Sequence, residues 1–322
     1  MGNSSRHRLA RLLGWLAGLA LLAAAALALR DQWHGVGEAG GLPGAAPSAA
    51  AAGLFLIANA VLAITWRAVV RAAGGGELPL RAAVWVWAAS QLARYSVGAA
   101  QVGGRAVLGR RYGLTLTAGG ATALVEIGWQ TAITALLVLA TLPWWLGVAD
   151  SLTWLAWAGV LPAVVLVVGL CAPARLLGAL AATLRWGPLA RLTRGRLGAA
   201  VDGVSLRRRD AVRLTGLYKL NTALRLAGVL VLFVAVGGDV GRHWPLVIGA
   251  ASLGQLVGRL AVFAPGGLGP REGATALALA PAIGGGPALV LVAATRLLEL
   301  VAELLFLAVA AVLRPAPEPV PR

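Results

Sequence analysis

Long apolar runs constrain this chain more than any other feature of its sequence. An α-helix needs about 20 mostly apolar residues to cross the roughly 30 Å hydrocarbon core of a bilayer. Six runs of that order carry few charged side chains, and they cover residues 9–29, 49–70, 117–141, 152–172, 215–236 and 287–312. The sequence therefore predicts an all-α, polytopic integral membrane helix bundle with about six full spans.

The composition excludes the common classes of soluble protein. Of the 322 residues, 59% are hydrophobic and 12% are charged, whereas soluble domains carry about 25% charged residues. Cys171 is the only cysteine, so the chain can form no intramolecular disulfide and no cysteine-rich metal cluster. The three histidines are not spaced as a ligand pair. We therefore expect no metal and no cofactor.

The net charge of +16 indicates a membrane surface and not a nucleic acid. Arginine supplies every basic side chain except Lys219, and the arginines lie between the apolar runs instead of along one soluble face. Basic loops beside apolar spans are typical of the cytoplasmic side of a membrane. The bias towards Arg, Ala and Gly is typical of a GC-rich bacterial genome. We expect a multi-pass protein of the bacterial inner membrane, without a nucleic-acid partner.

Two further apolar stretches, 82–109 and 244–283, contain helix breaks. The first carries Arg94 and Arg105 around a glycine-rich centre, and the second is interrupted by Pro-Gly-Gly-Leu-Gly-Pro at 265–270. Glycine and proline stop helices. The backbone groups they leave unpaired are tolerated at membrane depth only inside the protein or beside a wet cavity. We interpret both stretches as re-entrant helical hairpins.

The glycine-rich breaks at 98–104 and 265–269 occupy corresponding positions in the two halves of the chain. This pattern is expected of an inverted-repeat transporter whose site lies near the middle of the membrane. Glycines there allow the backbone to approach a bound group closely. Close helix packing is the alternative role for glycine, and it is our interpretation of Gly254-x-x-x-Gly258.

The positive-inside rule supports the hairpins and sets the orientation. Three arginines within residues 6–11 predict a cytoplasmic N-terminus. If 82–104 crossed the membrane fully, Arg105, Arg110 and Arg111 would face outward, whereas a hairpin keeps them in the cytoplasm. Following the charges to the end of the chain predicts that both termini are cytoplasmic.

We expect one transmembrane domain over residues 1–314 and a disordered, proline-rich tail over 315–322. The predicted cytoplasmic loop 173–214 holds nine arginines against Asp202 and Asp210. The loop is either a basic amphipathic helix on the anionic inner leaflet or a simple determinant of topology.

Charged side chains at bilayer depth cost several kcal/mol each, so they normally face the interior, pair, or line a pathway. Arg296, Glu299 and Glu303 share one face of the last predicted span, because they are spaced i, i+3 and i+7. The intramembrane charges are Arg94, Arg105, Arg225, Arg259, Arg271, Arg296, Glu126, Glu272, Glu299 and Glu303. They either form salt bridges that hold the bundle together or bind phosphate, and the excess of arginine favours phosphate.

Two groups of motifs carry a resemblance to a known family. The second half contains Phe-Ala-Pro-Gly-Gly-Leu-Gly-Pro-Arg-Glu-Gly at 263–273. The first half contains Arg-Tyr-Ser-Val-Gly at 94–98, Gly-Gly-Arg at 103–105 and Arg-Arg-Tyr-Gly at 110–113, followed by Glu126. Over most of its length the chain resembles the lysylphosphatidylglycerol synthase transmembrane, or flippase-like, family.

This resemblance implies an inner-membrane protein whose best-understood relatives move aminoacylated phosphatidylglycerol between leaflets. In fused relatives a soluble synthase domain follows the membrane part, whereas this sequence stops soon after its last apolar run. We therefore expect a lipid flippase or transporter that is not itself an enzyme. Its expected partners are a membrane phospholipid, anionic or aminoacylated, or a lipid-linked phosphate, and possibly a separately encoded synthase or glycosyltransferase.

The arginines, the glutamates and the glycine-rich break together predict a headgroup-binding site. We expect it to contain Arg94, Arg105, Glu126, Arg259, Pro265, Gly266, Gly267, Gly269, Arg271, Glu272, Arg296 and Glu299. Two alternatives remain at this point. One is a membrane-embedded glycosyltransferase, for which Asp31 and Glu38 would be candidate acidic residues, and the other is a structural partner of a lipid or cell-envelope synthase.

Overall fold

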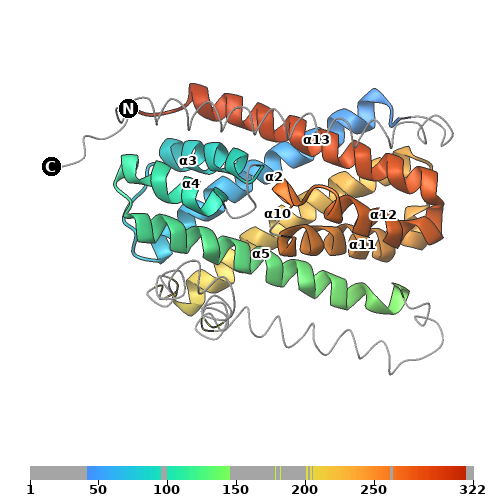
Figure 1. Cartoon of the computed structure of the whole chain (residues 1–322), viewed down its shortest axis with the longest axis horizontal. Helices are drawn as coiled ribbons and strands as arrows, with labels where there is room; N and C mark the ends of the chain where they lie inside the picture. Colours follow the sequence, from blue (N-terminus) through green and yellow to red (C-terminus); the bar gives the residue numbers. More distant parts are fainter. Residues whose placement is uncertain are drawn as a thin grey trace, which may run out of the picture.

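The computed structural model describes residues 42–95, 100–145, 206–261 and 264–316, together with residues 178, 182, 201 and 204. Within these residues the regular elements are all helices (Figure 1). They are α2 (Ala45–Ala72), α3 (Leu80–Ala93), α4 (Ala100–Gly109), η1 (Arg110–Tyr112), α5 (Leu116–Trp145), α10 (Arg208–Ala235), α11 (Val240–Leu260), η2 (Pro265–Gly267), α12 (Pro270–Ile283) and α13 (Gly285–Val312). The predicted spans 9–29 and 152–172 lie outside the described residues, as do most of loop 173–214 and of the tail 315–322.

Three long helices match three of the predicted spans. Helices α2, α5 and α10 have 28, 30 and 28 residues, and each is long and apolar enough to cross a membrane. At a rise of about 1.5 Å per residue they measure roughly 42–45 Å, which exceeds the hydrocarbon core. Helix α13, with 28 residues, covers the last predicted span. The prediction of a helical membrane protein is therefore confirmed, while the total number of spans and the inverted repeat stay predictions.

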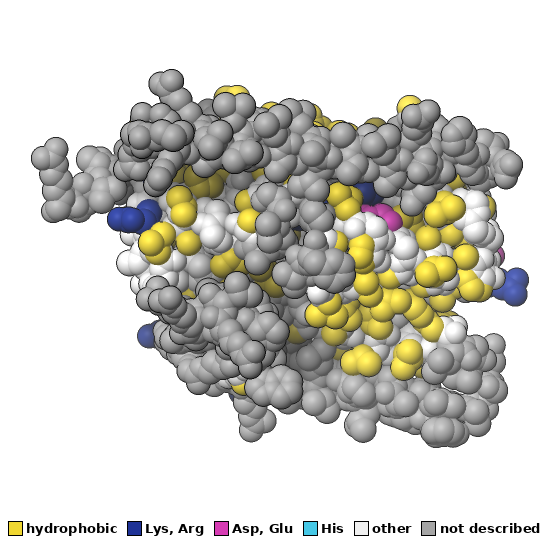
Figure 2. All heavy atoms as spheres, in the orientation of Figure 1, with side chains coloured by type: hydrophobic (Ala, Val, Ile, Leu, Met, Phe, Trp, Pro, Cys, Tyr) yellow, Lys and Arg dark blue, Asp and Glu magenta, His cyan; other side chains and the backbone are white. Residues whose placement is uncertain are grey.

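Large apolar side chains are exposed on the surface, while several charged side chains are buried inside. Leu277 and Leu260 are 77% and 68% exposed, whereas Arg105, Glu126 and Glu299 are only 1–2% exposed. Figure 2 shows apolar side chains gathered over the middle of the described surface, with basic side chains at its left and right edges. Lipid tails, and not water, are the solvent that such a surface fits.

Helices α3 and α4 form the first predicted hairpin, but the break predicted at 98–104 is wrong for residues 100–104, because α4 already begins at Ala100 and includes Gly103 and Gly104. The two helices run antiparallel, because a Cβ on Gly104 of α4 would lie 3.4 Å from Ser90 Cβ and 3.5 Å from Ala93 Cβ near the end of α3. With 14 and 10 residues, the two helices measure about 21 and 15 Å, so neither is long enough to cross the hydrocarbon core. Helix α5 begins a few residues after α4, at the open end of the hairpin.

Helices α11 and α12 form the second predicted hairpin. A Cβ on Gly254 would lie 2.8 Å from the carbonyl oxygen of Arg271, and one on Gly258 would lie 2.9 Å from Arg271 Cβ. The two helices therefore touch through the bare glycine face of α11. This confirms the packing role predicted for Gly254-x-x-x-Gly258.

The C-terminal end of α13 contacts the first hairpin, whose helices α3 and α4 lie on the left in Figure 1. Tyr112, beside Arg110 and Arg111, donates a hydrogen bond to the carbonyl oxygen of Pro315 at 3.3 Å. The Arg314 guanidinium lies 4.9 Å from the ring centroid of Trp85 near the start of α3. At the opposite ends of α5 and α11, Trp144 and Trp244 pack with ring centroids 6.4 Å apart. The orientation of the chain in the membrane stays a prediction from the loop charges.

The hairpin topology predicts a definite pattern of cysteine labelling. In a Cys171→Ala background, Arg111→Cys should react with a membrane-impermeant maleimide only after spheroplasts are permeabilised, because the loop charges predict that the open end of the first hairpin faces the cytoplasm. Arg242→Cys, near the start of α11, should react in intact spheroplasts. Labelling of Arg111→Cys in intact spheroplasts would show that 82–104 crosses the membrane.

Candidate functional site

A cavity of about 610 Å³ lies between the two hairpins and the long helices. Part of its wall is apolar, with Leu124 of α5 and Leu226 and Val229 of α10. The charged side chains that line it are Arg94, Arg225, Arg259, Arg271, Arg296, Glu126, Glu272, Glu299 and Glu303. The structure therefore brings most of the predicted site residues together in one cavity with both apolar and ionic walls.

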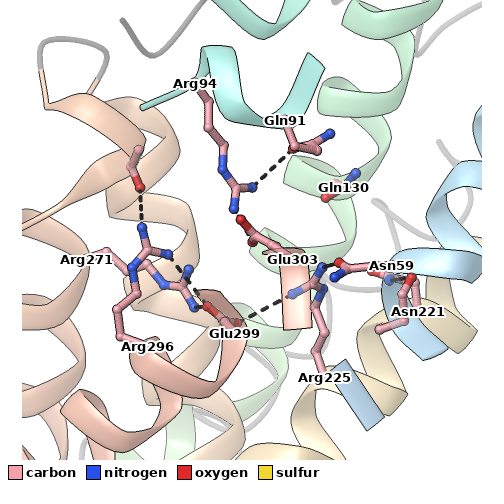
Figure 3. Close-up of polar contacts among 12 residues, drawn as sticks. Asn59, Gln91, Arg94, Gln130, Asn221, Arg225, Arg271, Arg296, Glu299 and Glu303 are labelled. Carbon is pink, nitrogen blue, oxygen red and sulfur yellow. Dashed lines mark hydrogen bonds and ion pairs between the residues drawn. The ribbon is translucent and has the colours of Figure 1, made fainter. Parts of the chain in front are cut away.

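Glu299 is the centre of the largest ion-pair cluster (Figure 3). Arg271 Nη2 of α12 lies 2.7 Å from its Oε2, and Arg225 Nη1 of α10 lies 3.5 Å from its Oε1. Arg296, one turn earlier on α13, places Nη1 3.7 Å from Oε2 and Nε 3.5 Å from Oε1 of Glu272. Three arginines from three helices therefore share two carboxylates.

A second cluster joins the end of α3 to α13. Arg94 forms an ion pair with Glu303 and donates a hydrogen bond to Gln91 Oε1 at 3.2 Å. The Tyr95 hydroxyl donates to the other oxygen of Glu303 at 2.8 Å. Glu303 thus pairs across the bundle with the first hairpin and not with Arg296 on its own helix.

The two helix breaks meet beside the cavity. The Gly266 N–H donates to the carbonyl oxygen of Arg94 at 2.9 Å. Arg296 Nη2 donates to the carbonyl oxygen of Gly266 at 3.4 Å, and its guanidinium lies 5.6 Å from the ring centroid of Tyr95. The Gly266 N–H and the Arg94 carbonyl therefore satisfy each other across the two halves of the chain, and the Gly266 carbonyl is satisfied by α13.

The second break needs its glycines. Gly266, Gly267 and Gly269 have φ values of 61°, 73° and 87°, in the left-handed region that side chains disfavour. A Cβ on Gly267 would also lie 2.9 Å from the backbone of Gly258. Glu272 accepts a hydrogen bond from the Gly269 N–H at 2.8 Å and so caps the start of α12. Pro265 opens the short helix η2, as part of the same break.

Arg105 is the one predicted arginine that does not line the cavity. Its Nη2 lies 2.6 Å from Glu126 Oε1, and its guanidinium lies 5.4 Å and 5.8 Å from the ring centroids of Trp66 and Trp87. Glu126 therefore stands between Arg105 and the cavity. The pair ties α4 to α5, a structural role that sequence reasoning did not separate from binding.

Arg259 has no carboxylate partner within the described part of the chain. Its Nη1 donates to Thr134 Oγ1 at 2.7 Å and to the Gln130 carbonyl oxygen at 3.2 Å, and its Nη2 donates to Gln130 Oε1 at 3.3 Å. These are neutral oxygens of α5, so the positive charge of Arg259 stays uncompensated at the cavity wall.

Sequence reasoning missed the neutral polar residues of the cavity, which include Gln91, Gln130 and Thr134, and also missed Tyr95, which bonds Glu303. It also omitted Asn59, whose Oδ1 accepts from Arg225 Nη2 at 2.7 Å. Asn59 is the only amide side chain in the predicted span 49–70, and this isolation was the available signal. Among the described residues, no group of three or more His, Cys, Asp or Glu side chains could hold a metal ion.

Comparison with known proteins gives one family. The model of the family described as "Lysylphosphatidylglycerol synthase TM region" matches residues 9–306. No curated protein and no solved structure matches the chain. The match includes both helix breaks and every charged residue that lines the cavity.

Gly267→Val tests the geometry of the second break. We expect it to lower the free energy of unfolding by about 2 kcal/mol or more, because a positive φ and an overpacked contact each cost about 1–3 kcal/mol. Expression should stay near the wild-type level, since the flanking helices are unchanged. Gly273→Val is the matched control, because a Cβ there would meet no atom within 4 Å. Thermal unfolding in mild detergent measures both variants, and equal unfolding temperatures would contradict the tight contact.

Proposed function

Since the chain belongs to the lysylphosphatidylglycerol synthase TM region family, we propose that it transports a lipid by binding its anionic headgroup in the cavity. The family supports the broader statement of a membrane protein in lipid or cell-envelope biosynthesis or transport. Our proposal adds the movement of the lipid between leaflets, with the bacterial inner membrane as its location and both termini in the cytoplasm. A separately encoded synthase or glycosyltransferase would supply the lipid, and this chain would catalyse no reaction.

The cavity's mixed wall is the observation that carries the proposal. A lipid has a charged headgroup and apolar chains, and the cavity offers arginines beside Leu124, Leu226 and Val229. Gly103 and Leu116 also line the cavity and are exposed, so it reaches the surface beside α4 and α5. A headgroup could therefore enter while its chains stay in contact with apolar surface.

The ion pairs of the cavity support reversible anion binding. A cluster of bare arginines would be strongly destabilising in a low-dielectric interior, and Glu299 and Glu272 compensate most of that charge. Each guanidinium has five N–H donors, so a paired arginine keeps donors for a phosphate oxygen. A headgroup phosphate can therefore accept hydrogen bonds from these donors, in place of water, while the ion pairs that hold the helices together stay formed.

The meeting of the two breaks suggests how access to the site would change. The hydrogen bond of Gly266 with Arg94 joins one hairpin to the other at the cavity wall, and that of Gly266 with Arg296 joins the second break to α13. Transporters with broken helices expose a fixed site alternately by moving one such element against the other. We propose that the hairpins are these elements.

Reconstitution tests this function directly. Proteoliposomes with the purified chain should move fluorescent phosphatidylglycerol between leaflets faster than empty liposomes. Arg271→Ala should slow this movement by about tenfold or more, because a charge-assisted hydrogen bond is worth about 1.5–3 kcal/mol and 1.4 kcal/mol is a factor of ten. Glu272→Gln should slow it less, since Gln can still accept from the Gly269 N–H.

Arg71→Ala is the matched control. Arg71 forms an ion pair with Glu77 at the exposed end of α2, and such surface pairs contribute little. Its transport rate should equal that of the wild type. Equal transport rates for wild type, Arg71→Ala and Arg271→Ala would show that the cavity takes no part in transport. If the wild-type protein moves lipid no faster than empty liposomes do, the proposal of transport is rejected.

A further inference from the structure

We propose that the preferred headgroup of the cavity ends in a phosphate that carries two negative charges, as in a phosphate monoester or a diphosphate. This inference rests on the proposed function and names its substrate class. It disfavours a phosphodiester with one charge, and it disfavours an aminoacylated phospholipid, whose headgroup carries ammonium groups. Three features of the described residues carry it: the occupied carboxylates, the charge balance and the environment of Arg259.

The carboxylates of the cavity are already engaged by the protein. Both oxygens of Glu299 face arginines, and both oxygens of Glu303 are taken by Arg94 and Tyr95. Glu272 accepts from the Gly269 N–H with Oε2, and its Oε1 has no hydrogen bond but forms an ion pair with Arg296 Nε at 3.5 Å. An ammonium group of an aminoacyl lipid would have to displace an arginine from one of these partners.

Glu126 is the remaining acidic side chain of the cavity. Its Oε1 accepts from Arg105 Nη2 at 2.6 Å and from Trp87 Nε1 at 3.3 Å. Its Oε2 has no hydrogen-bond partner, yet the charge of the carboxylate is balanced by Arg105, which is almost fully buried behind it. Glu126 therefore offers one oxygen but no uncompensated negative charge to a cationic ligand.

The charges of the cavity and its immediate partners do not sum to zero. Arg94 balances Glu303, and Arg105 balances Glu126. Arg225, Arg271 and Arg296 share Glu299 and Glu272, which leaves one positive charge in that cluster. Arg259 adds a second, because its described partners are neutral oxygens. A phosphate monoester carries about −1.5 to −2 at neutral pH and would compensate both.

Arg259 also presents donors that the protein does not use. Its three hydrogen bonds engage Nη1 and Nη2, so the Nε–H has no partner among the described residues. Arg259 lines the cavity on α11, and its neighbour Gly258 packs against Arg271. A phosphate between Arg259 and the Arg271 cluster would therefore meet both uncompensated charges at once.

Binding measurements on the purified full chain in neutral detergent test this substrate class. The probes are dioctanoyl phosphatidic acid, dioctanoyl phosphatidylglycerol, dioctanoyl lysyl-phosphatidylglycerol and glycerol 3-phosphate. We expect phosphatidic acid to bind about tenfold or more tightly than phosphatidylglycerol at pH 8. This ratio should fall towards one at pH 5, because the second phosphate pKa of about 6 means that the monoester then keeps only one charge.

Arg259→Gln should bring the affinity for phosphatidic acid down to about that for phosphatidylglycerol. It should not lower the unfolding temperature, because it removes an uncompensated buried charge. Arg105→Gln is the contrasting variant: it leaves Glu126 without its cation and should lower the unfolding temperature. A loss of stability in Arg259→Gln similar to that in Arg105→Gln would make Arg259 a structural residue and overturn its assignment.

The outcomes separate this inference from the proposed function. Phosphatidylglycerol or its lysyl derivative binding as tightly as phosphatidic acid at pH 8 would overturn the two-charge headgroup and leave lipid binding intact. Glycerol 3-phosphate binding as tightly as phosphatidic acid would identify a free phosphate as the ligand and overturn the lipid source. If none of the lipids binds, the proposed function fails together with the inference.

Discussion

Compensation of buried arginine charge by Glu299 is the interaction on which the rest of the site depends. Glu299 lies on α13 and receives Arg271 from α12 and Arg225 from α10, so one carboxylate fixes three helices around the cavity. Removing it would leave several cations in a low-dielectric interior, where an uncompensated charge costs several kcal/mol. The cluster that we propose as the anion site therefore also determines how the second hairpin sits against the long helices.

The glycine breaks make this arrangement sterically possible. Each hairpin stops inside the bundle, and its freed backbone groups need partners there. Gly266 provides such partners by meeting Arg94 and Arg296, and only a glycine holds the required positive φ without strain. Gly267 lies against Gly258, which brings the break to α11 at backbone distance. Ion pairs and glycines therefore act together, because the first compensate charge and the second permit the approach.

The features that could be predicted from the sequence are those that depend on residues close to one another along the chain. Helices α2, α5 and α10 follow from apolar runs, and both hairpins follow from breaks that divide an apolar stretch into two helices. Partners across the bundle could not be predicted, because Tyr95 and Glu303, for example, are 208 positions apart. Arg105 shows the limit: buried charge predicted a functional side chain, but only the fold shows that Glu126 separates it from the cavity.

The excess of positive charge in the cavity also indicates that its residues are not arranged for stability alone. A bundle selected only for stability would match each buried cation with an anion or replace it by an apolar side chain of similar volume, and the pairs of Arg105 and Arg94 follow that rule. Arg259 does not follow it, although a carboxylate in place of Gln130 or Thr134 would compensate it. Uncompensated charge lowers the stability of the empty protein and is offset only when an anion arrives. Functional sites commonly lower the stability of the protein locally in this way. Here the destabilising charge is that of Arg259, which also keeps an unused hydrogen-bond donor for a ligand.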